Sequence, residues 1–184
     1  MKNQILLSVL MIVSMLILAA CDQKQAAETL PASTSSISSS ILLKSKPDGS
    51  ISITQARTTV KPGEKIVLSG EIGGRKNDTF GATFSTFFLA DPDAIINCLK
   101  KHKGEAGCPT PWDYCCTPKE KILESIALIQ YKSPKTGKIH NQSFKGWQGL
   151  KELSMVTISG TVDSASSPKS LIINLEGIYI HPSN

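Results

Sequence analysis

Four cysteines near the middle of the chain are the residues whose type and spacing best suit chemistry. They are Cys98, Cys108, Cys115 and Cys116. Thiols grouped in this way pair as disulfides, bind a soft metal ion as thiolates, or take part in redox exchange. Their number is even, and the N-terminus predicts export to an oxidising compartment, so we expect two disulfides. Because a bond between the adjacent Cys115 and Cys116 closes a strained ring, each should pair with one of the other two cysteines, and both combinations stay open.

Metal binding is an alternative use of the same four cysteines. Zinc or cuprous copper accepts four thiolates, and His102 lies close enough in the sequence to contribute an imidazole. The spacing lacks the Cys-x-x-Cys pair that is typical of zinc sites and of thiol redox enzymes. We therefore predict no cofactor, and we keep metal binding and thiol redox chemistry as the alternatives.

Outside the cysteines, no group of residues has the spacing of a catalytic site, so we predict a protein that is not an enzyme. The segment Gly73-Gly74-Arg75-Lys76 is not a phosphate-binding P-loop. Arg75 and Lys76 could bind an anion beside the barrel, but a solvated turn is the role we favour for this loop. Trp112 and Tyr114 are further possible ligand contacts, but rings in a Cys-rich loop more often form a small internal core, which is the role we favour. The expected partner is an unidentified small molecule or protein.

The first residues have the features of a lipoprotein signal peptide, which we assign to residues 1–20. A basic residue precedes an apolar run from Ile5 to Leu18, and the segment Leu18-Ala19-Ala20-Cys21 follows. The run is shorter than the ~20 apolar residues that span a bilayer. This pattern resembles the lipobox of bacterial lipoproteins. The resemblance implies that Cys21 is acylated and holds the protein on a lipid bilayer of the cell envelope, facing the periplasm or exterior. Asp22 implies the inner membrane if sorting follows the enteric pattern.

The rest of the chain divides into a tether and one folded domain. We predict that residues 21–50 are the lipidated cysteine and a flexible Ser-rich tether, because Asp22 to Ser50 holds eight serines and no aromatic residue. Deleting residues 22–45 should then leave the melting temperature nearly unchanged. The length of residues 51–184 fits a single domain with one core.

Strand signals in residues 51–184 predict a mainly β domain, a small five-stranded barrel of the OB-fold type with one or two short helices. Apolar alternation and β-branched residues mark five runs. The predicted strands are 65–72, 82–90, 125–131, 154–162 and 171–180, and the predicted helices are a Ser-capped turn at 52–57 and a short helix over 144–153. All four cysteines fall between the second and third strands, in a Cys-rich insert over residues 92–121.

Two resemblances accompany these patterns. The runs Lys65 to Ile72, Val156 to Val162 and Ile172 to Ile180 are similar to those of bacterial OB-fold proteins of the periplasm. That resemblance implies a compact barrel of a kind that often binds small molecules or serves in stress responses. The segments Gly73-Gly74-Arg75-Lys76 and Cys108-Pro-Thr-Pro-Trp-Asp-Tyr-Cys-Cys116 resemble those of uncharacterised bacterial lipoproteins, and this resemblance implies no particular activity.

The composition argues against a nucleic-acid partner. Aromatic residues make up 5% of the chain, too few for the rows of stacking rings that bind single strands. The net charge of +5 is a modest excess, and an exported lipoprotein seldom meets nucleic acid. The sequence therefore predicts a membrane-anchored, extracytoplasmic lipoprotein that acts as a non-catalytic binding or interaction module, with a metal-binding or thiol-redox lipoprotein as the alternative.

Overall fold

The computed structural model of the chain describes residues 36–104 and 107–182. The predicted signal peptide, Cys21 and the first part of the predicted tether lie outside the described residues. The chain from Ser36 onward forms one compact unit.

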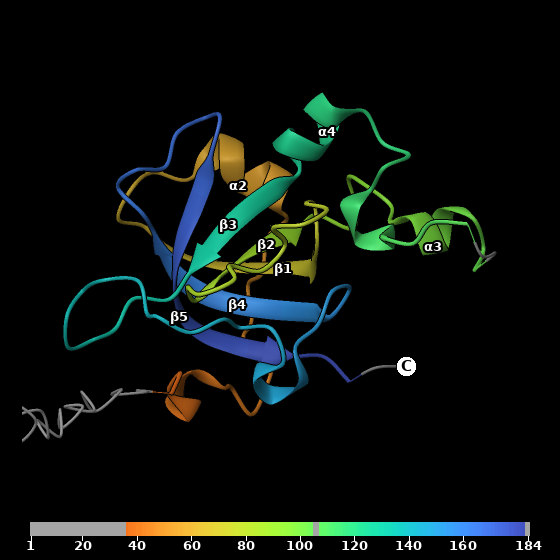
Figure 1. The fold of residues 1–184 in the computed structure, drawn as a ribbon. Helices are drawn as coiled ribbons and strands as arrows, with labels where there is room; N and C mark the ends of the chain where they lie inside the picture. Colours follow the sequence, from red (N-terminus) through yellow and green to blue (C-terminus); the bar gives the residue numbers. More distant parts are fainter. Residues whose placement is uncertain (1–35, 105–106, 183–184) are drawn as a thin grey trace, which may run out of the picture. The chain divides into compact units, whose positions relative to one another are not determined.

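Five strands in this unit form a closed barrel (Figure 1). They are β1 (Lys65–Ile72), β2 (Thr86–Ala90), β3 (Ile126–Gln130), β4 (Met155–Val162) and β5 (Leu171–Ile180). The order around the barrel is β1-β2-β3-β5-β4, and β4 pairs back with β1. The pair β3 and β5 is parallel, whereas the other four pairs are antiparallel. The predicted fold class, a mainly β five-stranded OB-fold-like barrel, is confirmed.

Alternating side chains of the strands fill the barrel, as the sequence pattern predicted. On β1, Ile66 and Leu68 point inward and are buried, and on β4 Val156 and Ile158 do the same. Phe87 of β2 packs edge-on against a second buried ring, Phe144, at 5.3 Å between ring centres. The apolar core therefore runs through the barrel and fixes the strands that carry the insert.

Short helices connect the strands, and one of the predicted helices does not form. In residues 36–104 and 107–182, the α-helices are α2 (Ile53–Thr59), α3 (Cys98–Lys101) and α4 (Lys119–Glu124), and the 3₁₀ turns are η1 (Ser39–Ile41), η2 (Pro111–Asp113) and η3 (Trp147–Gly149). The prediction of a Ser-capped helix is confirmed, since Ser52 accepts a hydrogen bond from the Gln55 backbone N–H at 3.1 Å. The predicted helix over 144–153 is wrong. Only η3 forms there, because Gly146 and Gly149 adopt positive φ angles that end a helix on both sides.

The predicted start of the domain at residue 51 is too late. Ile37 and Ile41 are buried at 3% and 6% exposure, and Leu42 forms a bridge to Ile178 of β5. The Leu43 backbone N–H also donates to the Ile178 carbonyl at 2.8 Å. A few isoleucines and leucines among the serines thus pack this segment against the barrel, although its composition is that of a flexible tether.

No helix among residues 36–104 and 107–182 is long and apolar enough to cross a membrane.

Candidate metal centre

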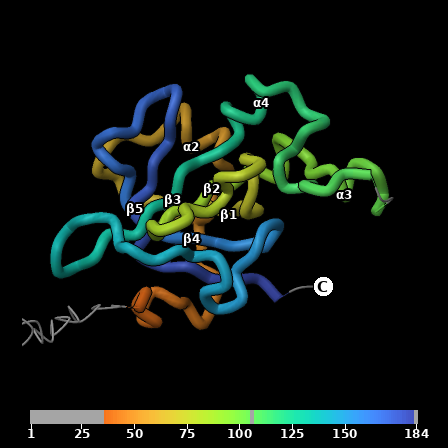
Figure 2. Tube along the Cα trace, in the orientation of Figure 1, coloured from red at the N-terminus to blue at the C-terminus, as the bar shows by residue number. Residues whose placement is uncertain are grey.

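The connection between β2 and β3 folds into a lobe beside the barrel, which we call the insert lobe (residues 92–104 and 107–121). Figure 1 and the trace in Figure 2 show it extending from the ends of β2 and β3, with α3 in its outer part. All four predicted site cysteines lie in this lobe. Cys98 is the first residue of α3, which Asn97 caps by accepting a hydrogen bond from the Lys100 backbone N–H at 3.0 Å. The other three cysteines flank η2 on both sides.

The four sulfur atoms gather into one cluster, which we call the thiol cluster. The Sγ of Cys115 lies 3.3 Å from that of Cys98, 3.4 Å from that of Cys108 and 3.9 Å from that of Cys116. The Sγ atoms of Cys98 and Cys116 are 3.8 Å apart. The sequence therefore predicted the residues of the cluster, and the fold brings together side chains separated by up to 18 residues in the chain.

The cysteines are free thiols in this structure, so the predicted disulfides are not confirmed. A disulfide needs about 2.05 Å between sulfur atoms, and the contacts of the cluster are longer by more than 1 Å. The two contacts of Cys116 are close to the ~3.8 Å edge of a tetrahedron of thiolates around an ion with metal–sulfur bonds of about 2.3 Å, and the contacts of Cys115 with Cys98 and Cys108 are shorter than that edge. The sulfurs of Cys98, Cys108 and Cys115 belong to a group of side chains close enough together that it could hold a metal ion.

Two further ligand types border the thiols. A carboxylate oxygen of Asp113 lies within 4.8 Å of the sulfurs of Cys98, Cys108 and Cys115, and these atoms are all within that distance of one another. On the other side, the Nε2 atom of His102 lies 3.3 Å from the Sγ of Cys116. Carboxylate, imidazole and thiolate are the ligands of zinc sites in proteins. The contribution of His102 was anticipated from the sequence, whereas that of Asp113 was not.

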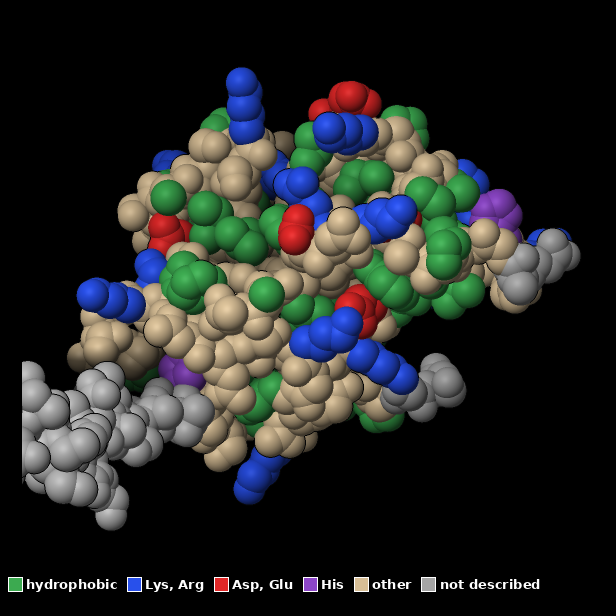
Figure 3. Space-filling model, in the orientation of Figure 1, with side chains coloured by type: hydrophobic (Ala, Val, Ile, Leu, Met, Phe, Trp, Pro, Cys, Tyr) green, Lys and Arg blue, Asp and Glu red, His purple; other side chains and the backbone are tan. Residues whose placement is uncertain are grey.

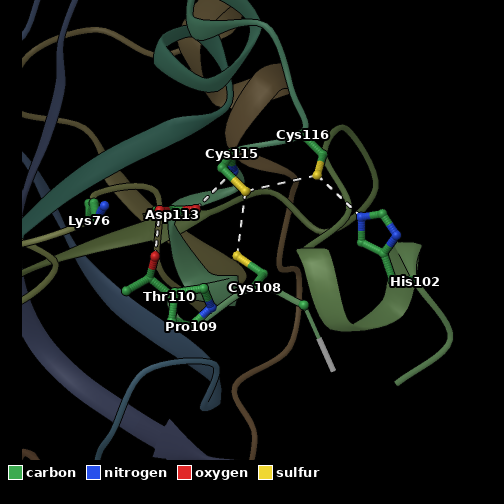
Figure 4. Close-up of a pocket in the computed structure, with 9 residues that line it drawn as sticks. Lys76, His102, Cys108, Pro109, Thr110, Asp113, Cys115 and Cys116 are labelled. Carbon is green, nitrogen blue, oxygen red and sulfur yellow. Dashed lines mark hydrogen bonds between the residues drawn. The ribbon is translucent and has the colours of Figure 1, made fainter. Parts of the chain in front are cut away.

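The cluster is open to solvent through a cavity of about 390 Å³ (Figure 4). Its lining includes Lys76, His102, Cys108, Cys115 and Cys116. Cys98 does not line the cavity and is buried at 1% exposure, whereas Cys115 is exposed. An ion could therefore reach the sulfurs of Cys108, Cys115 and Cys116 without unfolding of the lobe.

Crowding of the thiols changes the acidity of Cys115. Hydrogen bonding with Cys98, and then with Cys108, raises the pKa of the Cys115 thiol well above its usual range. A thiol with a raised pKa carries little thiolate at neutral pH, which makes it a poor nucleophile. A bound cation reverses this preference, because metal ions displace the thiol protons on binding.

Glu71 of β1 joins the lobe to the barrel. It is 5% exposed, and its carboxylate accepts hydrogen bonds from Asn97 Nδ2 at 2.6 Å, Tyr114 OH at 3.0 Å and Lys100 Nζ at 2.9 Å. Burial, and then the charge of Glu71, raises the pKa of Tyr114 far above its usual range. Asn97 and Tyr114 directly precede Cys98 and the exposed Cys115 in the chain. One buried carboxylate thus holds the backbone on both sides of the thiol cluster.

The glycine pair after β1 provides the surface on which η2 rests. The Gly74 backbone N–H donates to the carbonyl of Trp112 at 2.7 Å. A Cβ atom on Gly73 would stand 2.8 Å from that carbonyl oxygen and 3.0 Å from the ring of Tyr114. Only a residue without a side chain fits there. The segments around Gly73 and around Trp112 therefore pack against each other.

The predicted ligand contacts divide into accessible and inaccessible residues. Arg75 and Lys76 are exposed, and the Arg75 guanidinium lies over the Phe88 ring at 5.0 Å. Lys76 lines the cavity beside the cluster, and Trp112 is half-buried with its Nε1 donating to the Lys76 carbonyl at 3.2 Å. Tyr114 has the other role considered for it, because its side chain is fully buried in a small core with Ile95 and Ile126 and is not accessible as a ligand contact.

Basic side chains are spread over the face seen in Figure 3 and do not form one patch. A scattered arrangement gives no continuous track for a phosphate backbone on that face.

No protein family and no curated protein matches the chain.

Proposed function

We propose that this protein is a lipid-anchored, extracytoplasmic lipoprotein that binds a thiophilic metal ion, Zn²⁺ or Cu⁺, in its insert lobe and catalyses no reaction. The thiol cluster is the observation that carries the proposal. Its four sulfurs make contacts of 3.3 to 3.9 Å, which exceed the length of a disulfide and bring the four thiols close enough to share bound metal.

Metal binding explains the cluster better than a structural or a catalytic role. A structural group of thiols would be buried, whereas Cys115 is exposed and faces a cavity. A catalytic thiol requires a lowered pKa, whereas hydrogen bonding with Cys98 raises the pKa of Cys115. Thiolate ligands select Cu⁺ and Zn²⁺ over hard cations such as Mg²⁺ and Ca²⁺.

The proposed location strengthens the case for a bound ion. The lipobox before Cys21 supports acylation and export, and an acyl anchor places the folded unit outside the cytoplasm. Free thiols a few ångströms apart are readily oxidised in such a compartment. A metal ion that occupies the sulfurs protects them, so the export signal and the free thiol cluster fit together if the site carries a metal.

The proposal is tested on the full chain, extracted in detergent without oxygen and supplied with Zn²⁺ or with Cu⁺. We expect bound metal by elemental analysis and a native mass that exceeds the denatured mass by that metal. The variant Cys115→Ser should lose most of the metal, because its sulfur contacts the other three. His181→Ala, which removes a potential ligand outside the cluster, is the matched control and should retain it.

Two results would contradict the proposal. One is a protein without metal whose denatured mass rises on reduction by the four hydrogens of two disulfides. The other is a protein with four alkylatable thiols that retains neither ion. Both results would leave the lobe as a structural feature or a surface for another partner.

A further inference from the structure

We propose that the thiol cluster binds two metal ions that are bridged by the sulfurs of Cys98 and Cys115. This inference rests on the proposed function, which requires a thiophilic ion but does not say how many. It follows from the way in which the six potential ligands of the lobe divide into two sets that share two sulfurs.

The first ligand set contains three sulfurs and one oxygen. The sulfurs of Cys98, Cys108 and Cys115 and a carboxylate oxygen of Asp113 all lie within 4.8 Å of one another. Asp113 is fixed in this position, because it accepts hydrogen bonds from the Cys115 backbone N–H at 2.8 Å and from the Thr110 hydroxyl at 2.7 Å. Four donors in this arrangement complete the coordination of one tetrahedral ion.

The second ligand set contains three sulfurs and one nitrogen. The sulfur of Cys116 lies 3.8 Å from that of Cys98 and 3.9 Å from that of Cys115, and these values are close to the ~3.8 Å edge of a tetrahedron of thiolates. His102 Nε2 approaches Cys116 at 3.3 Å as a fourth donor. Figure 4 shows Cys108 and Cys116 on different sides of Cys115, with His102 facing Cys116.

The short contact between the shared sulfurs supports a bridge. Two ions that are each about 2.3 Å from both Cys98 and Cys115, whose sulfurs are 3.3 Å apart, would stand about 3.2 Å from each other. A single tetrahedral ion would instead require about 3.8 Å between every pair of sulfurs, and the contacts of Cys115 at 3.3 and 3.4 Å are shorter.

The charge of the ligands also favours more than one cation. Four thiolates and the Asp113 carboxylate carry more negative charge than one divalent ion neutralises. A second divalent ion offsets most of the negative charge that one ion leaves. Lys101 adds a positive charge at the edge of the cluster, where its Nζ donates to the Cys116 carbonyl at 2.7 Å. Zn²⁺ balances this charge better than Cu⁺, and both ions accept bridging thiolates.

The test counts ions bound by the full chain in detergent after loading with Zn²⁺ in one series and with Cu⁺ in another. We expect two ions per chain by native mass spectrometry and elemental analysis in at least one series. Cys108→Ser removes a sulfur from the first set only and should leave one ion, and Cys116→Ser should do the same for the second set. Cys115→Ser alters both sets and should leave less than one.

Cys108 and Cys116 are partly exposed, so neither substitution should unfold the barrel, and the circular dichroism spectrum of each variant checks this. A wild-type protein that binds one ion at saturation would overturn the two-ion site while leaving the proposed function intact. Folded Cys108→Ser and Cys116→Ser variants that each lose all metal would also overturn the two-ion site. A wild-type protein that binds neither metal would overturn the proposed function itself.

Discussion

Glu71 is the residue on which the placement of the thiol cluster most depends. On β1 the alternating residues Ile66 and Leu68 face the barrel core, and Glu71 stands on the opposite side of the strand, where the sequence pattern predicts exposure to solvent. The insert lobe covers that position, and Glu71 is 5% exposed. Sequence analysis could not identify this residue, because its burial results from a segment far along the chain. The cysteines, by contrast, were identifiable from their type and number.

We predict that Glu71→Gln weakens Zn²⁺ binding by about 10–100-fold, in the range found for residues that orient metal ligands without touching the metal. A glutamine has one acceptor oxygen for the three donors that the carboxylate holds, so the backbone before Cys98 and before Cys115 should lose its fixed position. Competition with a chromophoric zinc chelator measures the affinity. Glu176→Gln, in an exposed ion pair with Lys65, is the matched control and should bind normally.

A purely structural role for Glu71 predicts a different pattern. The melting temperature of the Glu71→Gln variant would then fall, with no change in zinc affinity at temperatures where the protein is folded. Glu71→Asp should recover part of the affinity if the carboxylate positions the ligands, because it restores the charge with a shorter side chain.

At the scale of elements, the strands were predictable because a half-buried strand imposes a period of two on its side chains. The five predicted strands match the observed ones, with β2 beginning at Thr86 instead of residue 82. The helix predicted over 144–153 does not form, although its apolar residues have helical spacing. Gly146 and Gly149 disfavour a helix and adopt positive φ angles, which a right-handed helix does not contain. The short helices α3, in the lobe, and α4, which begins at the end of the lobe and continues beyond it, depend on tertiary contacts that no local pattern reports.

A polar cluster joins three strands at one place on the barrel. Asp163, which follows β4, accepts hydrogen bonds from Lys132 Nζ at 2.7 Å and from Gln130 Nε2 at 3.0 Å. Gln130 of β3 also donates to Asn174 of β5 at 2.9 Å. The hydrogen bond from Lys132, followed by one from the Ala165 backbone N–H, lowers the pKa of Asp163 to about 2. This cluster should stabilise the junction of β3, β4 and β5.

We predict that Asp163 makes the stability of the barrel sensitive to acid. Because its folded pKa is below the unfolded value of about 3.9, its contribution is present above pH 4 and is lost as the pH falls towards 2. The Asp163→Asn variant should be about 1–2 kcal/mol less stable at pH 7, a value reduced for the partial exposure of Lys132. Urea unfolding at pH 7, 4 and 2.5 measures the difference, which should shrink at the lowest pH. Asp78 is exposed, so the control variant Asp78→Asn should not lower the free energy of unfolding. A loss of unfolding free energy in Asp163→Asn that is the same at every pH would contradict the role proposed for the Asp163 carboxylate.

At the scale of the whole molecule, the folded unit begins earlier in the chain than composition suggests. Eight serines in residues 22–50 indicate a tether, yet the structure places Ile37 and Ile41 in the barrel core. A few apolar side chains are enough to order a short segment when a hydrophobic surface is available, and composition averaged over thirty residues conceals them. The tether proposed from the sequence therefore shortens to residues 22–35.

We predict that two deletions and one substitution will separate anchoring from stability. Deleting residues 22–35 should change neither membrane association nor the melting temperature. Deleting residues 22–45 should keep the protein on the membrane but lower the free energy of unfolding by about 2–4 kcal/mol, because it removes the buried Ile37 and Ile41. Cys21→Ala should have the opposite effect, releasing the protein from the membrane or blocking its processing without a change in the melting temperature.

Detergent extraction with cell fractionation measures the anchoring, and thermal unfolding of the extracted proteins measures the stability. Ile37→Ala with Ile41→Ala in the full-length chain is the matched control, since it removes the same two side chains and keeps the length of the tether. It should lower the stability nearly as much as the longer deletion, because the buried apolar surface and not the chain length is what stabilises this end of the domain. If neither the deletion of residues 22–45 nor the double alanine variant lowers the melting temperature, residues 36–45 add nothing to the stability of the folded unit. If the Cys21→Ala protein stays on the membrane, the acyl anchor is no longer part of the proposed function.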